Sequence, residues 1–483
     1  MSDAVDTALS VRLAANTFVQ VAGGVLASLV SFFTFVAVTR GLGPEAFGNF
    51  TAATVFLFIP VVLADVGLST AVLREISASP ERTEPAMRAS LPLRALISAG
   101  ALAVAVAVGM SMPFNSQTKA AILISAAGAF FTLLTLSLQP VLQAQLKMHW
   151  AAAATLAGRI TTLALTLGAL AVGLGFKSIV AAQVIGLAVT FLLHVVAVAA
   201  IVPLWPIVDI AYWRRLLAGS IVIGLAISIS LIYFRVDTVL LALLRSSEEV
   251  GLYGAAYKFI ELVVLVPAAV GVSMFPPLAR FAASGDPRAV GLVQKTFDVL
   301  VAAAVPVIVL MLAYPEELLT LTAGPDYADA AVALQLLAPF ALFAFVNALF
   351  WRMGLAARRD RMLLAIAVSV LALNVVLNLV FIPSYGFKAA AVITVVSEAL
   401  ITIPIVLAAR SVTRLPNLAY LPVVGAAAAA MTTAVVLLPG PAALGALVAG
   451  ALYLAVLLLL PGTARDVVVR DLLPAVSGAV RRR

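Results

Sequence analysis

Residues Tyr233–Pro277, with the sequence YFRVDTVLLALLRSSEEVGLYGAAYKFIELVVLVPAAVGVSMFPP, form two apolar runs joined by a short charged turn. Apolar runs of this kind rarely carry ionisable side chains, because a charge in hydrocarbon is costly. This stretch nevertheless contains Arg235, Asp237, Lys258 and Glu261. Those four residues are therefore the first candidates for a functional site.

The rest of the chain has the composition of a protein dissolved in a bilayer. Its 483 residues are 64% hydrophobic and only 11% charged, and the mean hydropathy is +1.15. A soluble domain of this length needs far more polar surface. The apolar runs are continuous over about 18–28 residues and do not alternate, which favours membrane helices over a barrel. We therefore predict an all-α polytopic membrane protein.

Turn signals such as GLGPEAFG, MPFNSQ and IPSYGFK separate fourteen candidate spans. An arrangement of twelve spans would also place both termini on one side of the membrane. The last two runs are nevertheless long and apolar enough to count as spans. The predicted spans are residues 13–39, 46–72, 91–112, 119–145, 151–174, 178–202, 216–244, 251–275, 294–314, 329–357, 361–382, 388–409, 418–438 and 442–461.

The distribution of basic residues predicts that both termini are cytoplasmic. With that orientation, the opposite side holds Arg40, Lys119, Lys177, Arg245 and Lys388, and most of the 30 Lys and Arg residues lie inside. The net charge of +8 is then explained by cytoplasmic loops, and no nucleic-acid partner is expected. The chain has no cysteine and two histidines, so neither a thiolate nucleophile nor a metal site is expected. The first residues lack the basic region of a cleavable signal peptide.

An internal repeat divides the predicted spans into six, six and two. The sequence GPEAFGNFTAATVF at Gly43–Phe56 aligns without gaps on SSEEVGLYGAAYKF at Ser246–Phe259, and GFK occurs at 175–177 and again at 386–388. Parallel repeats of six spans are typical of transporters that work by alternating access around a central cleft. We predict an N-lobe at residues 1–202, an interfacial linker at 203–215, a C-lobe at 216–409, and two further spans with a basic tail at 410–483.

Three short motifs occur in matching order in a known family. They are TRGLGPEAFGNF with LADVGLSTAVLRE, then YFRVDTVLLALL with EEVGLYGAAYKFIE and FPPLAR, and finally IPSYGFKAAAV. Over essentially the whole chain the sequence resembles the polysaccharide transporter branch of the multidrug/oligosaccharidyl-lipid/polysaccharide exporter superfamily. The resemblance implies a flippase of the bacterial inner membrane. Its implied substrate is a polyprenyl-pyrophosphate-linked oligosaccharide for O-antigen, capsule or exopolysaccharide assembly.

Three other functions stay open at this stage. A lipid II flippase for peptidoglycan is not excluded, and a multidrug cation antiporter shares the architecture. A membrane polysaccharide polymerase or glycosyltransferase would need a catalytic outer surface, but the only acidic external loop, residues 313–329, is short. We therefore expect no enzyme activity and no cofactor, with H⁺, Na⁺ or the membrane potential as candidate driving forces. The expected partners are the lipid-linked glycan, membrane lipids and other polysaccharide-assembly membrane proteins.

Fixed cations within the spans are the candidate ligands of a pyrophosphate group, because they replace its water shell with charge-assisted hydrogen bonds. The candidate cations are Arg235, Lys258, Arg159 and Arg352. The candidate acids for ion coupling or charge compensation are Glu261, Asp237, Asp65 and Glu398.

Structural explanations compete with each of these roles. Arg235 and Asp237 are two residues apart and do not face each other on a regular helix. Each is therefore as well suited to a structural ion pair with another helix as to a substrate contact. Lys258 is long enough to reach the interface, and Glu261 at i+3 is placed to neutralise it. Snorkelling explains Arg352 and Arg159 equally well. For Asp65 the alternative is a pair with Arg74 across the helix end.

Overall fold

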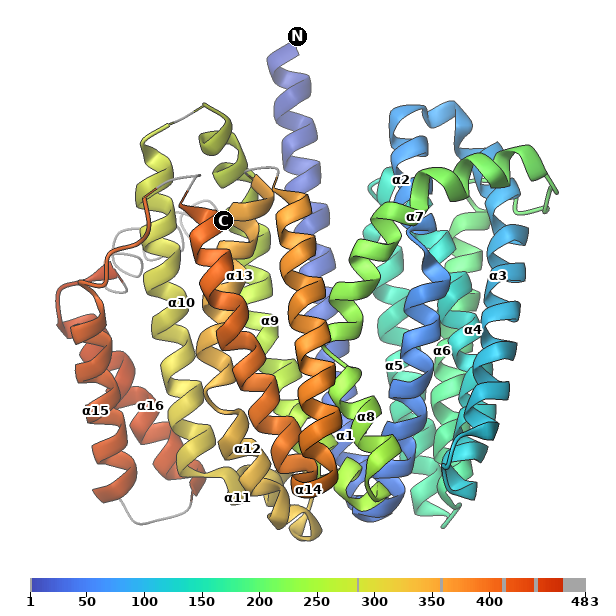
Figure 1. Ribbon diagram of the computed structural model, residues 1–483. Helices are drawn as coiled ribbons and strands as arrows, with labels where there is room; N and C mark the ends of the chain where they lie inside the picture. The colour runs from blue at the N-terminus through green and yellow to red at the C-terminus, as the bar shows by residue number, and fades with distance from the viewer. Residues whose placement is uncertain (1, 285, 357–358, 411–413, 438–441, 464–483) are drawn as a thin grey trace. The chain divides into compact units, whose positions relative to one another are not determined.

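The computed structural model describes residues 2–284, 286–356, 359–410, 414–437 and 442–463 (Figure 1). Throughout these residues the regular structure is helical, and they contain no strand. The predicted basic tail from residue 464 lies outside the described residues. The longer helices are α1 (Ser2–Asp65), α3 (Thr83–Ser111), α4 (Ser116–Ala144), α5 (Met148–Ala171), α6 (Phe176–Ala199), α7 (Ile210–Tyr233), α9 (Ser247–Ser284), α10 (Arg288–Ala313), α13 (Phe340–Ala356), α14 (Asp360–Ala409), α15 (Leu421–Leu437) and α16 (Ala442–Leu459).

Short helices connect or extend these elements. They are α2 (Leu68–Ala78), η1 (Pro80–Arg82), α8 (Val236–Leu244), α11 (Pro315–Thr322), η2 (Pro325–Ala330) and α12 (Ala331–Leu337). At two places short helices continue a longer helix across a bend: the end of α7 and α8 meet at 50°, and the η2–α12 segment meets α13 at 46°.

Two of the long helices each contain two membrane segments. Helix α1 has 64 residues and α14 has 50, whereas a helix rising 1.5 Å per residue crosses about 30 Å of hydrocarbon in about 20 residues. Each is broken at a glycine, Gly43 (φ 72°, ψ 173°) and Gly386 (φ 57°, ψ −141°), in backbone conformations that L side chains rarely adopt. Figure 1 shows the α14 ribbon turning back on itself near its label.

The predicted spans all lie on apolar helices. Among the described residues, eight helices are long and apolar enough to cross a membrane, or up to ten when each bent pair counts as one span; α15 and α16 are shorter apolar helices. With α1 and α14 each divided at its glycine, the fourteen predicted runs fall in order on these segments. Large apolar side chains remain exposed on them, including Val104, Leu123 and Val196, as expected for lipid-facing helices. The protein is a polytopic all-α membrane protein.

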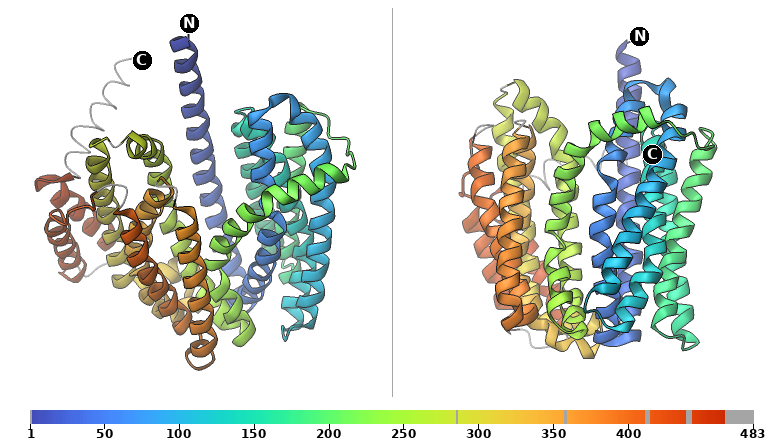
Figure 2. Two further views of the ribbon diagram at one scale, coloured as in Figure 1. Left: turned by 45° about the horizontal axis from the view of Figure 1, so that its top comes forward. Right: turned by 45° about the vertical axis from the view of Figure 1, so that its right-hand side comes forward.

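The chain divides into two compact units, Met1–Gly251 and Leu252–Arg483. In the first unit α3, α4, α5 and α6 lie side by side (Figure 2). Helices α5 and α6 approach closely because Gly158 lies against Thr190 and the Gly186 carbonyl, and Gly186 lies reciprocally against Thr162 and the Gly158 carbonyl. Small residues at such contacts let membrane helices pack backbone to backbone. In the second unit α16 is fastened to α10 by the Tyr453 hydroxyl, which donates to the Ala302 carbonyl at 2.7 Å.

Residues 203–209 have no regular structure and are held against α3. The Ile207 amide donates to the Arg88 carbonyl at 2.9 Å, and the Trp213 indole donates to the Ala89 carbonyl at 2.8 Å. Helix α7 then begins at Ile210, inside the predicted linker, with the Asp209 carboxylate accepting from the Tyr212 amide as its N-cap. The lobe boundaries inferred from the repeat stay a prediction.

The repeated sequences meet each other in the first unit. A Cβ on Gly48 would overlap the Ser247 carbonyl, and a Cβ on Gly251 would overlap the Pro44 carbonyl. In the repeat alignment Pro44 corresponds to Ser247 and Gly48 to Gly251. Each repeat therefore makes the same contact to the other, as a local two-fold relation requires. Glycine is required at both positions because the two backbones touch.

Candidate functional site

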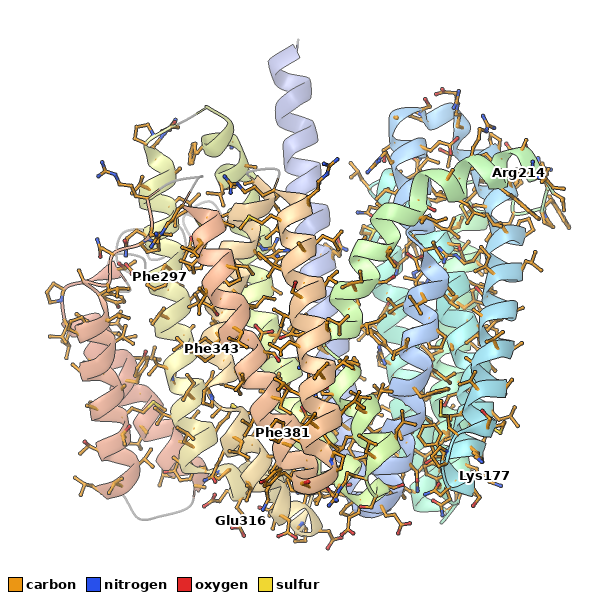
Figure 3. The ribbon with its side chains drawn as sticks, in the orientation of Figure 1. Lys177, Arg214, Phe297, Glu316, Phe343 and Phe381 are labelled. Carbon is orange, nitrogen blue, oxygen red and sulfur yellow. The ribbon has the colours of Figure 1, made fainter. Side chains whose placement is uncertain are left out.

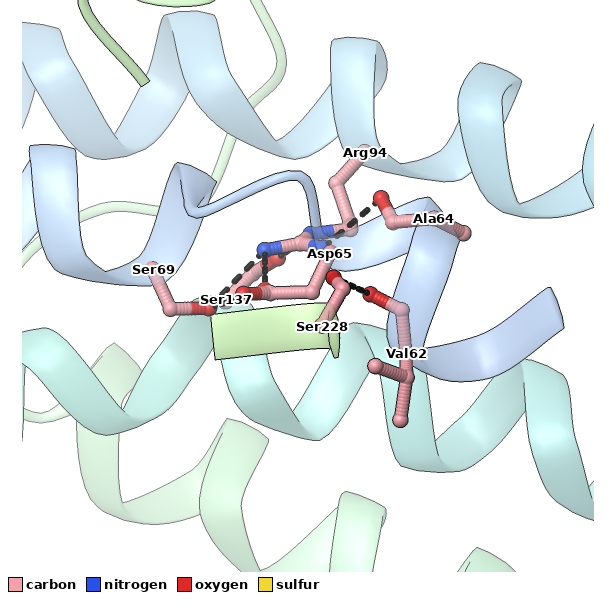
Figure 4. Close-up of polar contacts among 7 residues, drawn as sticks. All are labelled: Val62, Ala64, Asp65, Ser69, Arg94, Ser137 and Ser228. Atoms are coloured by element: carbon pink, nitrogen blue, oxygen red, sulfur yellow. Dashed lines mark hydrogen bonds and ion pairs between the residues drawn. The ribbon is translucent and has the colours of Figure 1, made fainter. Parts of the chain in front are cut away.

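A buried ion pair lies where α1 ends. The Arg94 guanidinium on α3 donates to the Asp65 carboxylate at 2.6 Å, and its side chain is only 1% exposed. The same guanidinium donates to the Ser137 and Ser69 hydroxyls at 2.8 and 2.9 Å and to the Ala64 carbonyl (Figure 4). Four helices, α1 to α4, thus contribute to one polar cluster. A buried guanidinium with this many acceptors is held in a single orientation.

The backbone break between α1 and α2 makes this cluster possible. Val66 and Gly67 both have positive φ, 44° and 72°, which ends α1 directly after Asp65 and directs its carboxylate toward α3. A Cβ on Gly67 would meet the backbone of Gly224 on α7 at 2.7–2.8 Å. On the other side of the break, the Ser228 hydroxyl of α7 donates to the Val62 carbonyl at 3.1 Å. Helix α7 is therefore packed directly against the break.

Arg94 is a residue that sequence reasoning did not select. The sequence offers Arg74 as the alternative partner of Asp65. The structure joins Asp65 at the end of α1 to Arg94 on α3 instead, 29 residues further along the chain. One available signal was that Arg94 falls inside the predicted span 91–112 and therefore needs a counter-charge in the membrane.

Arg235 and Asp237 lie on either side of the bend between α7 and α8. Arg235 occupies the N-cap position of α8 and is half-buried, whereas Asp237 in the first turn is 2% exposed. The Asp237 carboxylate accepts from the Thr238 amide at 2.6 Å. A carboxylate in the first turn is favourably placed toward the positive end of the helix dipole.

Lys258 and Glu261 form an ion pair on α9. The Lys258 ammonium lies 2.7 Å from the Glu261 carboxylate, and the two side chains are 24% and 29% exposed. The i,i+3 neutralisation considered from the sequence is therefore present. Both side chains remain partly accessible.

Arg352 occupies a different environment, on α13 of the second unit. It is half-buried, and its guanidinium lies against the backbone of Gly271 on α9, where any Cβ would overlap it. No hydrogen bond or ion pair connects Arg352 to any side chain that the structure describes. Gly271 therefore makes room for a half-buried guanidinium between α9 and α13.

Glu398 belongs to a buried polar network in the second unit. Its carboxylate accepts from the Asn347 side-chain amide at 2.7 Å, and it is 4% exposed. The same amide also donates to the Glu398 backbone carbonyl at 3.0 Å, which ties α13 to α14. At the residue directly before Glu398, the Ser397 hydroxyl accepts from the Asn374 side-chain amide at 2.9 Å.

The structure thus separates the predicted site residues into several local groups. Within the first unit, Asp65 lies in the Arg94 cluster, Arg235 and Asp237 lie at the α7–α8 bend, and Arg159 is exposed on α5. In the second unit Lys258 and Glu261 are paired, while Arg352 and Glu398 lie on α13 and α14. Their roles toward a substrate stay predictions.

Several solved structures share the fold of this chain. The lipid II flippase MurJ, in its inward closed conformation, superposes with a TM-score of 0.76 at 14% identity, over 94% of this chain and all of that one. A MOP-superfamily transporter from Pyrococcus furiosus, described as having a binding pocket of reverse polarity, gives 0.57 at 18% identity, over 83% of this chain and 94% of that one. An outward-facing multidrug resistance MATE transporter gives 0.56 at 16% identity over the same shares. The chain therefore has the fold that these three transporters share.

Sequence comparison identifies the family. A family model described as polysaccharide biosynthesis protein matches residues 13–282, which is more than half of the chain, and the MatE model matches residues 222–380. The chain belongs to the polysaccharide biosynthesis protein family.

Two curated relatives match a shorter part of the chain. The probable low-salt glycan biosynthesis flippase Agl15 of Haloferax volcanii is 24% identical over 179 residues, 35% of this chain and 36% of that protein. An uncharacterized membrane protein of Methanocaldococcus jannaschii, MJ1068, is 25% identical over 180 residues, 37% of this chain and 34% of that protein. The match thus spans about a third of the length of each relative.

Proposed function

We propose that this protein is a flippase that moves a polyprenyl-pyrophosphate-linked oligosaccharide across the bacterial inner membrane for surface polysaccharide assembly. Family membership supports the pathway, because the matching model is that of polysaccharide biosynthesis proteins. The name of the Haloferax relative, a glycan biosynthesis flippase, supports the transport step. The relatives and solved structures described above are named as flippases, transporters or membrane proteins.

The position of Arg352 is the observation that supports a substrate with a pyrophosphate group. A guanidinium with no counter-ion among the described side chains is costly in a membrane helix unless an anion reaches it. Pyrophosphate is such an anion, since its oxygens accept paired N–H donors from a planar guanidinium. Gly271 keeps this position open, because any side chain there would displace the guanidinium.

The experiment compares Arg352→Gln with Arg361→Gln in proteoliposomes. Arg361 lies at the start of α14 and is exposed, so it is a matched control for loss of one positive charge. Translocation of a fluorescent polyprenyl-pyrophosphate oligosaccharide is measured by loss of signal to an external quencher or glycosidase. We expect Arg352→Gln to lower the rate at least tenfold and Arg361→Gln to leave it within twofold. Normal transport by a well-folded Arg352→Gln variant would contradict the proposal.

A lipid II flippase is the second candidate, because the MurJ structure superposes over nearly the whole chain. Both substrates present a pyrophosphate, so Arg352 serves either. Parallel assays with lipid II and with the oligosaccharide-linked lipid separate the two functions. Rescue of a strain lacking its own lipid II flippase would favour peptidoglycan assembly.

The driving force for transport and the orientation of the chain in the membrane form part of the same proposal. We place both termini in the cytoplasm, which the Lys and Arg distribution supports. The proposed cycle is alternating access, with the driving force supplied by H⁺, Na⁺ or the membrane potential. Glu261 pairs with Lys258 on its own helix, so substrate pyrophosphate competes with it for that cation.

A further inference from the structure

A cavity of about 350 Å³ lies between α2 and α7 in the first unit. Its lining residues are Gly67, Ala71, Arg74, Glu75, Ala78, Tyr212, Arg215, Leu216, Gly219 and Ser220. This volume is at the lower end for small-molecule sites, so it holds a head group and not an oligosaccharide. None of the residues predicted from the sequence to bind substrate lines it.

The charges that line the cavity favour an anion. Arg74 and Arg215 are both exposed, and neither forms an ion pair or hydrogen bond with a side chain in the described part of the chain. The single acid, Glu75, is already engaged, because it accepts from the Tyr212 hydroxyl at 3.0 Å and lies 3.9 Å from Arg82. The cavity is therefore lined by two guanidiniums without a side-chain partner in the described part of the chain and by one carboxylate that is already paired.

The uncharged side chain of Tyr212 lines the same cavity as the two arginines. Burial, together with the Glu75 carboxylate, raises the pKa of the Tyr212 phenol, so it remains protonated at physiological pH. Its hydroxyl is committed to Glu75 and holds α7 against α2. The walls are fixed further by the contact between Gly67 and Gly224. The cavity is consequently formed before any ligand arrives.

The neighbouring segment places the cavity at the level of lipid head groups. Just before α7 the chain exposes Trp205, Val208 and Ile210, which are 76%, 68% and 60% accessible. Exposed tryptophan and aliphatic side chains next to arginines are typical of a segment lying in the membrane interface. Basic pockets between membrane helices at this depth are suited to anionic lipid head groups.

We propose that the α2–α7 cavity binds the phosphate of an anionic membrane phospholipid, with Arg74 and Arg215 as its ligands. The two guanidiniums donate to the phosphate oxygens, while the acyl chains lie along the exposed apolar side chains beside α7. This site is separate from the transported substrate and does not depend on which glycan the protein moves. A bound lipid would hold α2 and α7 together next to the break at Val66 and Gly67.

The test measures lipid binding to the purified full-length protein in detergent. Short-chain phosphatidylglycerol is titrated into wild type, Arg74→Gln, Arg215→Gln and the double variant, with a thermal shift as the readout. Arg214→Gln is the matched control, since Arg214 is exposed on α7 (Figure 3). Arg214 precedes Arg215 in the sequence and is not among the residues that line the cavity. We expect affinity to fall about tenfold in each cavity variant and to stay within twofold in the control.

Two further ligands test whether the bound phosphate belongs to an anionic lipid. Short-chain phosphatidylcholine carries no net charge, and glycerol phosphate has the head-group phosphate without acyl chains. We expect both to bind at least tenfold more weakly than phosphatidylglycerol. Equal binding of glycerol phosphate would overturn the lipid assignment. Unchanged phosphatidylglycerol affinity in the double variant, or an equal loss in Arg214→Gln, would overturn the site.

Discussion

Replacing Asp65 is expected to destabilise the protein more than replacing its partner Arg94. In Asp65→Leu, the Arg94 guanidinium stays 1% exposed and loses its counter-charge, and breaking a buried pair in this way costs about 3–5 kcal/mol. In Arg94→Met, Asp65 is left 23% exposed and still accepts from the Ser69 hydroxyl at 2.7 Å. The second change should therefore cost less, about 1–3 kcal/mol, mainly through the acceptors left at Ser137 and Ala64.

The double variant decides whether the two residues act as a pair. With both charges replaced by apolar groups, no uncompensated charge remains, so we expect the double variant to be no less stable than Asp65→Leu alone. The free energy of unfolding is measured in mixed micelles by a denaturing detergent titration. Arg245→Met is the control, because its i,i+4 pair with Glu249 has the same 2.6 Å separation but its arginine side chain is 34% exposed, and it should cost about 0.3–0.5 kcal/mol.

Two results would refute this reasoning. Additive effects of the single changes, within about 0.5 kcal/mol, would mean that Asp65 and Arg94 contribute independently. A loss in Asp65→Leu as small as that in Arg245→Met would mean that water or lipid head groups solvate the guanidinium.

Two further predictions concern the repeat and the candidate cations. Gly48→Ala and Gly251→Ala should each cost about 1–3 kcal/mol, because the added methyl group overlaps a backbone carbonyl, whereas Gly24→Ala, with nothing within 4 Å, should be nearly neutral in a thermal unfolding assay. Arg235→Ala and Lys258→Ala should abolish glycan export in a complementation assay while expression and membrane insertion persist; normal surface glycan from either variant would remove that residue from the substrate site.

Much of the fold was predictable because hydrocarbon leaves a chain few choices. Long apolar runs must satisfy their own backbone hydrogen bonds, so they form helices, and the glycines in GLGPEAFG and IPSYGFK mark where the chain turns back. The alignment of Gly48 with Gly251 likewise indicated a shared structural need. Their mutual contact, however, became visible only when both backbones were placed together.

The sequence by itself determined the helices, their order, the repeat and the presence of charges within the spans, because these follow from local hydropathy and spacing. Only the tertiary structure decided which charges on different helices meet. Asp65 pairs with Arg94 and not Arg74, and Arg352 lies against Gly271, because helix packing brings together residues that no sequence periodicity relates. The α2–α7 cavity has the same origin, since Arg74 and Arg215 are distant in sequence and become neighbours only through the packing of two helices.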